Sequence, residues 1–305
     1  MRMFKFGLII FMAVFLYTTG LHASPVRKKD INFFIEQCGG GRTGSFTKFT
    51  VTGFKDYPPF SWQGINEKET EIRDTNVYEY KGLVSDLVRE TLNDMTITRI
   101  KDLFFDDFYQ AQKAVLHGKT DLLFISYYIG DSAGQDYIYP AYFGNPFIVV
   151  SRASKKIDVE DASGLKGLKG VIRREEEIEN LIRGILPTDT KLEVVEGPKE
   201  AFRQLLSGEV DFMITSPYAA DAEARRFKIK DKLYYGTKAL RHIKYFLAFS
   251  KLSACRELKK LFTEKFMAKI KDKSEMEKLI QKYIQHWANI HADEPPLEYE
   301  PANDS

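Results

Sequence analysis

The sequence AQKAVLHGKTDLLFIS at residues 111–126 occurs a second time, in related form, as AFRQLLSGEVDFMITS at residues 201–216. Both versions have Ala first, Leu sixth, Gly eighth, Asp eleventh and Ser sixteenth. Apolar residues at helical spacing precede Gly118 and Gly208, where a left-handed helix end favours glycine. A short, largely apolar run follows each aspartate, as in a buried parallel strand. The pattern therefore predicts two helix-turn-strand units, one in each half of the chain.

A serine ends each predicted strand. Ligands of open α/β sheets bind beyond the carboxyl ends of the strands. Ser126 and Ser216 are therefore expected at the rims of two sheets, and two rims that face each other would form a cleft.

The composition is that of a globular protein large enough for two domains. The chain has 305 residues, of which 44% are apolar and 29% charged. This apolar content is sufficient for packed cores and is unlike that of disordered chains.

The N-terminus has the features of an export signal. Arg2 and Lys5 precede an apolar run at residues 7–18, which is too short to span a bilayer. Cleavage is expected near Ala23, so residues 1–23 would be a signal peptide and the mature protein periplasmic. An uncleaved membrane anchor is the alternative.

Removal of residues 1–23 takes away two basic residues and leaves 43 basic and 43 acidic ones. A neutral chain lacks the positive charge that binds nucleic acid. We therefore expect no nucleic-acid partner.

Cys38 and Cys255 are the two cysteines of the chain. An exported protein can form a disulfide, but the spacing leaves open whether these residues pair or remain as two partly buried thiols. Neither lies in a metal-binding motif, so no metal or cofactor is expected.

The order of the predicted elements divides the chain into two lobes. Lobe 1 is expected to comprise residues 24–146 and 244–290, and lobe 2 residues 147–243. Two extended stretches near these boundaries are candidates for the hinge crossings. Residues 291–305, rich in proline and acidic residues, are predicted to be a disordered tail.

Several short motifs in this order resemble the periplasmic solute-binding proteins of amino-acid-type ABC transporters. Each motif is weak alone, and the set covers roughly residues 50–288. The motifs lie at Tyr57–Phe60, Gly82–Leu87, Gly118–Asp121, Pro140–Tyr142, Gly208–Asp211 and Ser250–Leu258.

The resemblance implies a type II two-lobed α/β fold, in which two Rossmann-like lobes with mixed, mainly parallel sheets are joined by a two-strand hinge. It implies a monomer that closes around a small-molecule solute and works with an inner-membrane ABC permease or a sensor.

The groups that hold an α-amino acid in this family are missing here. The region Gly130 to Asp136 lacks the arginine that takes the ligand carboxylate. Arg173–Glu176 stands where a Gly-Thr or Gly-Ser helix start is usual, and Thr215–Pro217 stands where an aspartate takes the amino group. An ordinary α-amino acid is therefore not expected as the ligand.

The remaining candidates for the binding site are aromatic, hydroxyl and guanidinium groups. For the rings the alternative is a place in the core, for the serines a turn or helix cap, and for the arginines a solvated surface. The candidates are Tyr57, Phe60, Trp62, Ser126, Tyr127, Tyr128, Arg173, Arg174, Thr215, Ser216 and Tyr218.

Three functions remain open: a binding protein for uptake, a ligand sensor, and an enzyme on the same fold, such as a dehydratase. An enzyme would need an acid or base in the cleft, and His242 beside the hinge is the one histidine placed to supply it. No triad spacing or metal-ligand cluster is found. We therefore expect a binding protein and no catalytic activity.

Overall fold

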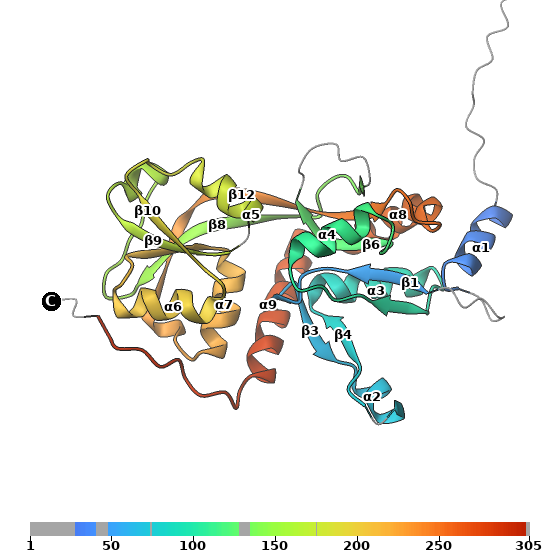
Figure 1. The fold of residues 1–305 in the computed structure, drawn as a ribbon, viewed down its shortest axis with the longest axis horizontal. Helices are drawn as coiled ribbons and strands as arrows, with labels where there is room; N and C mark the ends of the chain where they lie inside the picture. The colour runs from blue at the N-terminus through green and yellow to red at the C-terminus, as the bar shows by residue number, and fades with distance from the viewer. Residues whose placement is uncertain (1–27, 41–47, 74, 128–134, 175, 303–305) are drawn as a thin grey trace, which may run out of the picture.

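The computed structural model describes residues 28–40, 48–73, 75–127, 135–174 and 176–302. These residues form two α/β lobes linked by a continuous mixed sheet, with a second, three-stranded sheet on lobe 1 (Figure 1). This confirms the predicted fold class. The predicted signal peptide lies outside the described residues.

Lobe 1 contains the parallel strands β5, β1 and β6, with β12 antiparallel to β6. Helices α3 and α4 pack on this sheet, and α8 packs on α3. The elements of lobe 1 before the crossing are α1 (Lys28–Gln37), β1 (Phe49–Thr52), β2 (Asp56–Tyr57), β3 (Ser61–Ile65), α2 (Glu67–Arg73), β4 (Tyr78–Lys81), α3 (Leu83–Asp94), β5 (Ile100–Asp102), α4 (Phe108–Leu116), β6 (Leu122–Tyr127) and β7 (Gln135–Tyr137).

Lobe 2 repeats this arrangement with the parallel strands β10, β9 and β11. Helix α6 packs on all three of these strands. Its elements are η1 (Ala162–Leu165), β9 (Lys169–Arg173), α5 (Glu176–Arg183), β10 (Lys191–Val195), α6 (Pro198–Ser207), β11 (Phe212–Thr215), α7 (Pro217–Arg226) and η2 (Lys230–Lys232).

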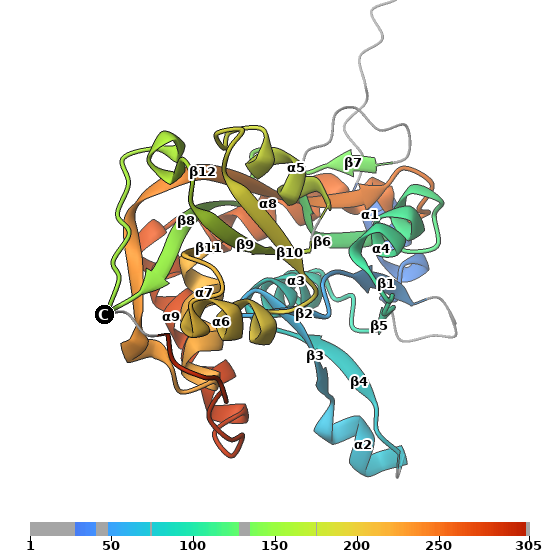
Figure 2. The same ribbon diagram turned by 60° about the vertical axis from the view of Figure 1, so that its left-hand side comes forward.

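Two long antiparallel strands, β8 (Phe143–Arg152) and β12 (Leu233–Ser250), run from one lobe to the other (Figures 1 and 2). The strand order is β10-β9-β11-β8-β12-β6-β1-β5, with β7 paired to β12. The sheets of the two lobes are thus one sheet that passes through the crossing. After β12 the chain forms η3 (Arg256–Leu258), α8 (Lys259–Lys269) and α9 (Lys273–Ile290), and α9 lies between the lobes.

The two repeated segments form the same local structure. In each, a helix ends and the chain turns at a glycine, with φ of 72° at Gly118 and 80° at Gly208. The following aspartate then joins two strand starts. Asp121 accepts a hydrogen bond from the Thr50 N–H at 2.8 Å, and Asp211 accepts one from the Lys169 N–H at 3.1 Å.

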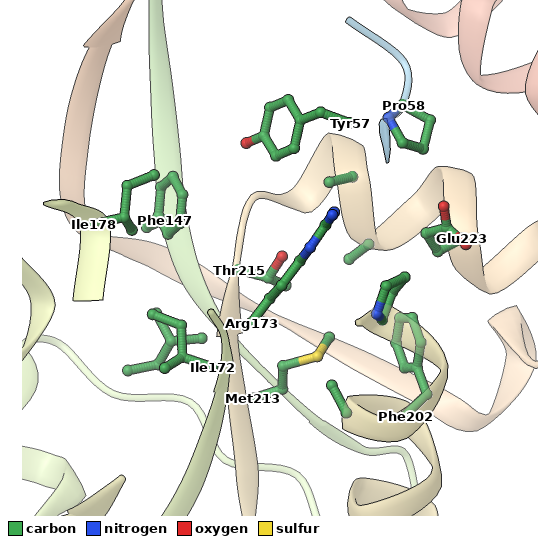
Figure 3. Close-up of a pocket in the computed structure, with 15 residues that line it drawn as sticks. Tyr57, Pro58, Phe147, Ile172, Arg173, Ile178, Phe202, Met213, Thr215 and Glu223 are labelled. Atoms are coloured by element: carbon green, nitrogen blue, oxygen red, sulfur yellow. The ribbon is translucent and has the colours of Figure 1, made fainter. Parts of the chain in front are cut away.

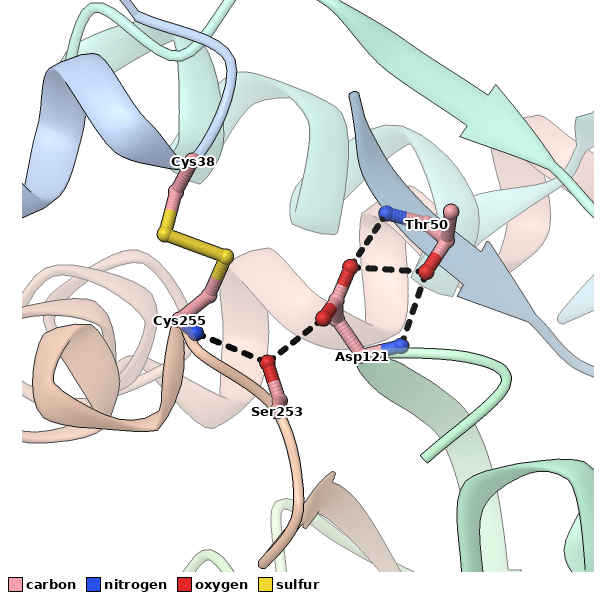
Figure 4. Close-up of a disulfide and its surroundings, with 5 residues drawn as sticks. All are labelled: Cys38, Thr50, Asp121, Ser253 and Cys255. Atoms are coloured by element: carbon pink, nitrogen blue, oxygen red, sulfur yellow. Dashed lines mark hydrogen bonds between the residues drawn. A yellow bond between two sulfur atoms is a disulfide. The ribbon is translucent and has the colours of Figure 1, made fainter. Parts of the chain in front are cut away.

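Cys38 and Cys255 form a disulfide, with their Cα atoms 5.6 Å apart (Figure 4). The bond ties the segment after α1 to η3. Ser253 connects it to the first repeated segment, because the Ser253 hydroxyl donates to Asp121 and accepts from the Cys255 N–H. The structure therefore selects the paired alternative that the sequence left open.

Residues 291–302, which we call the C-terminal strap, differ from the predicted disordered tail. The strap runs from the end of α9 along lobe 2 (Figure 1). The Leu297 N–H donates to the Phe227 carbonyl at 3.1 Å, and the Ala302 N–H donates to the Leu206 carbonyl at 3.2 Å. Composition was a poor guide here because Leu297 is buried in the lobe 2 core and Tyr299 packs against it.

None of the helices in the described ranges combines the length and the apolar character that crossing a membrane requires.

Candidate functional site

Two cavities that share one lining residue mark the cleft between the lobes. A cavity of about 480 Å³, which we call the mouth cavity, lies where the loop after β1 and the start of α4 face lobe 2. A smaller cavity of about 50 Å³, which we call the inner cavity, lies between Tyr57 and Pro58 of lobe 1 and the apolar face of lobe 2 (Figure 3). Arg173 at the end of β9 lines both cavities.

Arg173 spans the cleft. Its guanidinium donates to the Asp56 carbonyl at 2.6 Å and to the Asp56 carboxylate at 3.0 Å. The Arg173 side chain is 33% exposed, so water screens this ion pair and its contribution to stability is small. Arg174, the other arginine predicted for the site, pairs with Glu196 at the edge of the mouth cavity and is more exposed.

Behind this ion pair, four buried polar side chains form a hydrogen-bonded network across the lobes. Asn145 on the crossing strand β8 donates to the hydroxyl of Tyr57 at 3.0 Å and to that of Tyr245 at 2.7 Å. The two tyrosine hydroxyls are 2.7 Å apart. Ser216 donates to the Asn145 side-chain oxygen at 2.7 Å. The network satisfies polar groups that the contact between the lobes removes from water.

Aromatic rings form the lobe 1 wall of the cleft. Phe54 and Phe108 stack with ring centroids 4.2 Å apart and an interplanar angle of 2°. Tyr127 packs against both rings. Phe54 and Phe108 also line the mouth cavity, so this wall is a surface on which a flat or apolar ligand could stack.

Glu223 on α7 lines the inner cavity and is 3% exposed. Neither carboxylate oxygen has a hydrogen-bond partner among the described residues, although Arg226 lies 3.5 Å away. Burial, followed by the charge of Asp56, raises the pKa of Glu223 to about 8, against the lowering effects of Arg226 and Arg173. At neutral pH this carboxyl is therefore mostly protonated in the structure described.

Comparison with known proteins identifies the fold. No family model and no curated protein matches the sequence. Among solved structures, the chain is similar to an amino acid ABC transporter substrate-binding protein, AbpA, from Streptococcus pneumoniae bound to L-arginine, with 18% identity, 79% of this chain and 95% of that chain covered, and a TM-score of 0.61. It is also similar to the GluR0 ligand-binding core in complex with L-glutamate, with 14% identity, 80% and 100% covered, and a TM-score of 0.62.

A third similar structure is a histidine kinase sensor domain described as similar to periplasmic binding proteins, with 19% identity, 77% and 95% covered, and a TM-score of 0.58. The chain has the type II periplasmic binding protein fold. The cleft between its lobes is the place where the repeated helix-turn-strand pattern of the sequence predicts a ligand.

The type II fold brings four of the predicted site residues to the two cavities: Tyr57, Arg173 and Thr215 line the inner cavity, and Arg174 lines the mouth cavity. Ser216 reaches the cleft through Asn145. Tyr127 forms part of the aromatic wall and also lines a groove beside β12. Tyr128 lies outside the described residues.

Four other predicted site residues are held by packing within the type II fold. Phe60 is fully buried against Tyr245, and Trp62 packs on Trp287 of α9 with ring centroids 5.2 Å apart. Phe60 directly precedes β3 and Trp62 lies within it, and both rings are buried in the lobe 1 core.

Ser126 is also buried, and its hydroxyl donates to the neighbouring Tyr127 carbonyl at 3.4 Å. It stands inside the sheet because β6 continues one residue past it. The Tyr218 hydroxyl donates to Glu277 of α9 at 3.2 Å, which turns it away from both cavities.

Sequence reasoning missed Phe54, Asp56, Phe108, Asn145 and Glu223. Phe54 lies in the short loop after β1 and Asp56 at its end, so the rule that ligands gather beyond strand ends could have found them. Asn145 and Glu223 carry no local signal, because their roles depend on contacts between distant segments.

Nowhere among the described residues do three or more His, Cys, Asp or Glu side chains come together in a way that could hold a metal ion.

Proposed function

We propose that this protein is an exported binding protein that captures a small solute between its lobes. The observation that carries the proposal is the mouth cavity, which both lobes line and which ends at the Asp56–Arg173 ion pair. Its volume of about 480 Å³ lies within the range of roughly 300 to 1,000 Å³ that is typical of small-molecule sites.

The proposed mechanism is closure of the lobes around the solute. In the structure described, protein groups satisfy one another across the cleft: Arg173 binds Asp56, and Asn145 binds Tyr57 and Ser216. A solute that enters would take over some of these contacts. The half-exposed ion pair is the weakest of them and would exchange first.

The solute proposed here is not an ordinary α-amino acid. A ligand carboxylate would need a bidentate arginine, and at Arg173 it would have to displace the Asp56 carboxylate and remain beside it. The aromatic wall instead favours a solute with an apolar or aromatic body.

The destination of the solute, or of the signal, has two candidates. Delivery to an ABC permease is supported by the similarity to a transporter substrate-binding protein. Reporting to a membrane receptor is supported by the similarity to a histidine kinase sensor domain. In either role we propose a monomer located in the periplasm.

We propose further that the protein has no catalytic activity. His242, the histidine singled out from the sequence, is exposed on β12 and lines a groove separate from the two cleft cavities. Recovery of the solute unchanged after prolonged incubation is the expected result, and recovery of a converted product would show an enzyme.

The proposed function is tested by a thermal-shift screen of small metabolites, followed by small-angle X-ray scattering with each compound that stabilises the protein. A ligand present at a thousand times its Kd stabilises by about 4 kcal/mol. We expect such a ligand to reduce the radius of gyration, and R173A to lose this compaction.

The matched control for that experiment is R183A, because Arg183 on α5 lines neither cleft cavity. If no compound changes the melting temperature or the radius of the wild-type protein, the proposed function is wrong.

A further inference from the structure

Five charged side chains from four separate segments lie in the surroundings of Glu223, and two of them, Arg173 and Glu223 itself, line the inner cavity. Asp56 comes from lobe 1, Arg173 from β9, Glu223 and Arg226 from α7, and Glu294 from the C-terminal strap. Each of the other four contributes to the electrostatic environment of Glu223. The cluster therefore contains three carboxyl groups and only two guanidinium groups.

The two arginines already have partners. Arg173 binds Asp56 through its carbonyl and carboxylate, and Arg226 binds the Glu294 carboxylate with two hydrogen bonds of 2.8 and 3.1 Å. Glu223 is held less closely by Arg226 than Glu294 is. Its carboxylate lies 3.5 Å from the Arg226 guanidinium and has no hydrogen bond among the described residues. When Glu223 is ionised, the cluster carries one negative charge more than its arginines neutralise.

The walls of the inner cavity cannot solvate that charge. Apart from Arg173, Thr215 and Glu223, the side chains that line it are apolar or aromatic, and Ile172, Phe202 and Met213 form its floor (Figure 3). A buried, unpaired carboxylate in such surroundings is costly unless a cation joins it. The figure shows Glu223 beside Pro58, at the side of the cavity that faces lobe 1.

We propose that the inner cavity binds the ammonium group of a small amine that lacks a carboxylate, with Glu223 as its counter-ion. This proposal rests on the proposed function, since the amine must enter between the lobes. It deepens that function by naming the chemical class of the solute.

The size of the inner cavity indicates which part of the amine it would hold and which part would lie in the mouth cavity. A water molecule needs roughly 10 to 15 Å³ of such volume, so about 50 Å³ accommodates a head group and a few further atoms. The rest of the ligand extends past Arg173 into the mouth cavity, where Phe54 and Phe108 stack. An arylalkylamine fits this division better than methylamine.

Binding of the amine changes the protonation of Glu223. The carboxyl is mostly protonated at pH 7 in the structure described, and an ammonium group beside it would favour the carboxylate. The carboxyl proton therefore leaves for solvent as the ion pair forms, and close to one proton is released per amine bound at pH 7. A ligand carboxylate would instead face a second carboxyl, which excludes acids and zwitterions.

The test is isothermal titration calorimetry of the full mature chain with three matched probes: 2-phenylethylamine, 3-phenylpropanoate and L-phenylalanine. We expect 2-phenylethylamine to bind at least about tenfold more tightly than either probe with a carboxylate. The variant E223Q, a neutral isostere of the protonated carboxyl, should weaken the amine about tenfold or more. The control E257Q, at an exposed acid on η3, should change its affinity less than twofold.

A second measurement uses only the wild-type protein, in case E223Q does not fold. The affinity for 2-phenylethylamine should rise about tenfold from pH 6 to pH 7 and level off above about pH 8, as Glu223 ionises. Titration in buffers of different ionisation enthalpy should show the released proton.

The outcomes separate this inference from the proposed function. If L-phenylalanine or 3-phenylpropanoate binds with compaction and the amine does not, the binding function stands and the ligand class is wrong. If E223Q binds the amine as tightly as wild type, or the affinity does not change between pH 6 and pH 7, the assignment of Glu223 is overturned. If the amine fails and the metabolite screen finds another ligand, the inference is overturned alone.

Discussion

The two repeated segments start alike and end differently. Each has a glycine turn and an aspartate that joins two parallel strands. In lobe 1 the segment is anchored further, because Asp121 also binds Ser253 next to the disulfide, and its final serine is buried inside the sheet. In lobe 2 the final serine begins α7 and bonds to Asn145 in the cleft. The same sequence pattern thus builds a fixed frame in one lobe and part of the site in the other.

Removal of the disulfide is the test of this difference with the largest expected effect on stability. The bond joins residues 217 apart, and closing so long a loop in the unfolded chain favours the native state. The double variant C38S/C255S should lower the free energy of unfolding by about 4 kcal/mol, measured by urea denaturation. An unchanged urea midpoint would show that lobe 1 does not depend on this anchor.

The two aspartates give the next largest effect. Asp121→Ala removes acceptors for the Thr50 N–H, the Thr50 hydroxyl and the Ser253 hydroxyl, so we expect a loss of about 3 kcal/mol. Asp211→Ala removes one backbone bond and an exposed bond from Lys155, and should cost about 1 kcal/mol. Urea denaturation of both variants decides the order, and equal losses would contradict an unequal anchoring of the lobes.

The pH dependence of stability should come from lobe 2. The pKa of Glu223 is raised from its ordinary value of 4.5 to about 8, so between these values the native state holds a proton that the unfolded state has lost. Stability should therefore be greatest below about pH 4.5 as far as this group is concerned, and fall as pH rises to about 8. We expect the wild type to lose about 3 kcal/mol relative to E223Q between pH 5 and pH 8. If the free energy of unfolding depended on pH in the same way for the wild type and E223Q, the raised pKa of Glu223 would be contradicted.

The buried Asp102 of lobe 1 provides a contrast within the same experiment. Burial raises its pKa as well, but Arg89 donates to both of its oxygens at 2.6 Å and opposes the rise. The variant D102N should therefore lose stability, measured in the same urea series, because an amide cannot form the ion pair with Arg89.

The smallest effect separates the two serines. Ser216→Ala breaks a buried bond to Asn145 and leaves that amide oxygen unsatisfied, which should cost about 1 kcal/mol. Ser126→Ala removes only a long bond within the chain, and should change stability by less than about 0.5 kcal/mol. Only Ser216→Ala should alter the scattering radius of the ligand-free protein. A larger loss in Ser126→Ala would place the more important serine in lobe 1.

The fold could be predicted from the sequence because its signals are local. A helix pattern, a glycine and a short apolar run were enough to locate α4 and β6, and later α6 and β11. The crossing strands also follow from apolar runs of strand length. Arg173 could be proposed for the site because it stands where the resembling family usually has a Gly-Thr or Gly-Ser helix start, and the structure places it at the end of β9.

The rest of the site depends on contacts between distant segments. Pairing of Asp56 with Arg173 joins residues 117 apart, and the environment of Glu223 combines both lobes with the strap. Burial of Trp62 was set by α9, which contacts it from the far end of the chain. Spacing also could not show that Cys38 meets Cys255, because the helix α1 that positions Cys38 has no strong sequence pattern.

The C-terminal strap adds to the links between the lobes, which also include the hydrogen bond from Tyr218 of α7 to Glu277 of α9. Strands β8 and β12 run side by side, so on their own they would allow the lobes to rotate through a wide angle about this pair. Helix α9 holds lobe 1 through the hydrogen bond from Tyr283 to Asp86, and the strap then holds lobe 2 through Leu297 and Ala302. Because these contacts lie away from the crossing strands, they would limit the angle through which the two lobes can separate. Removal of residues 291–305 would therefore let the lobes separate further and would widen the entrance to the cleft for the proposed solute.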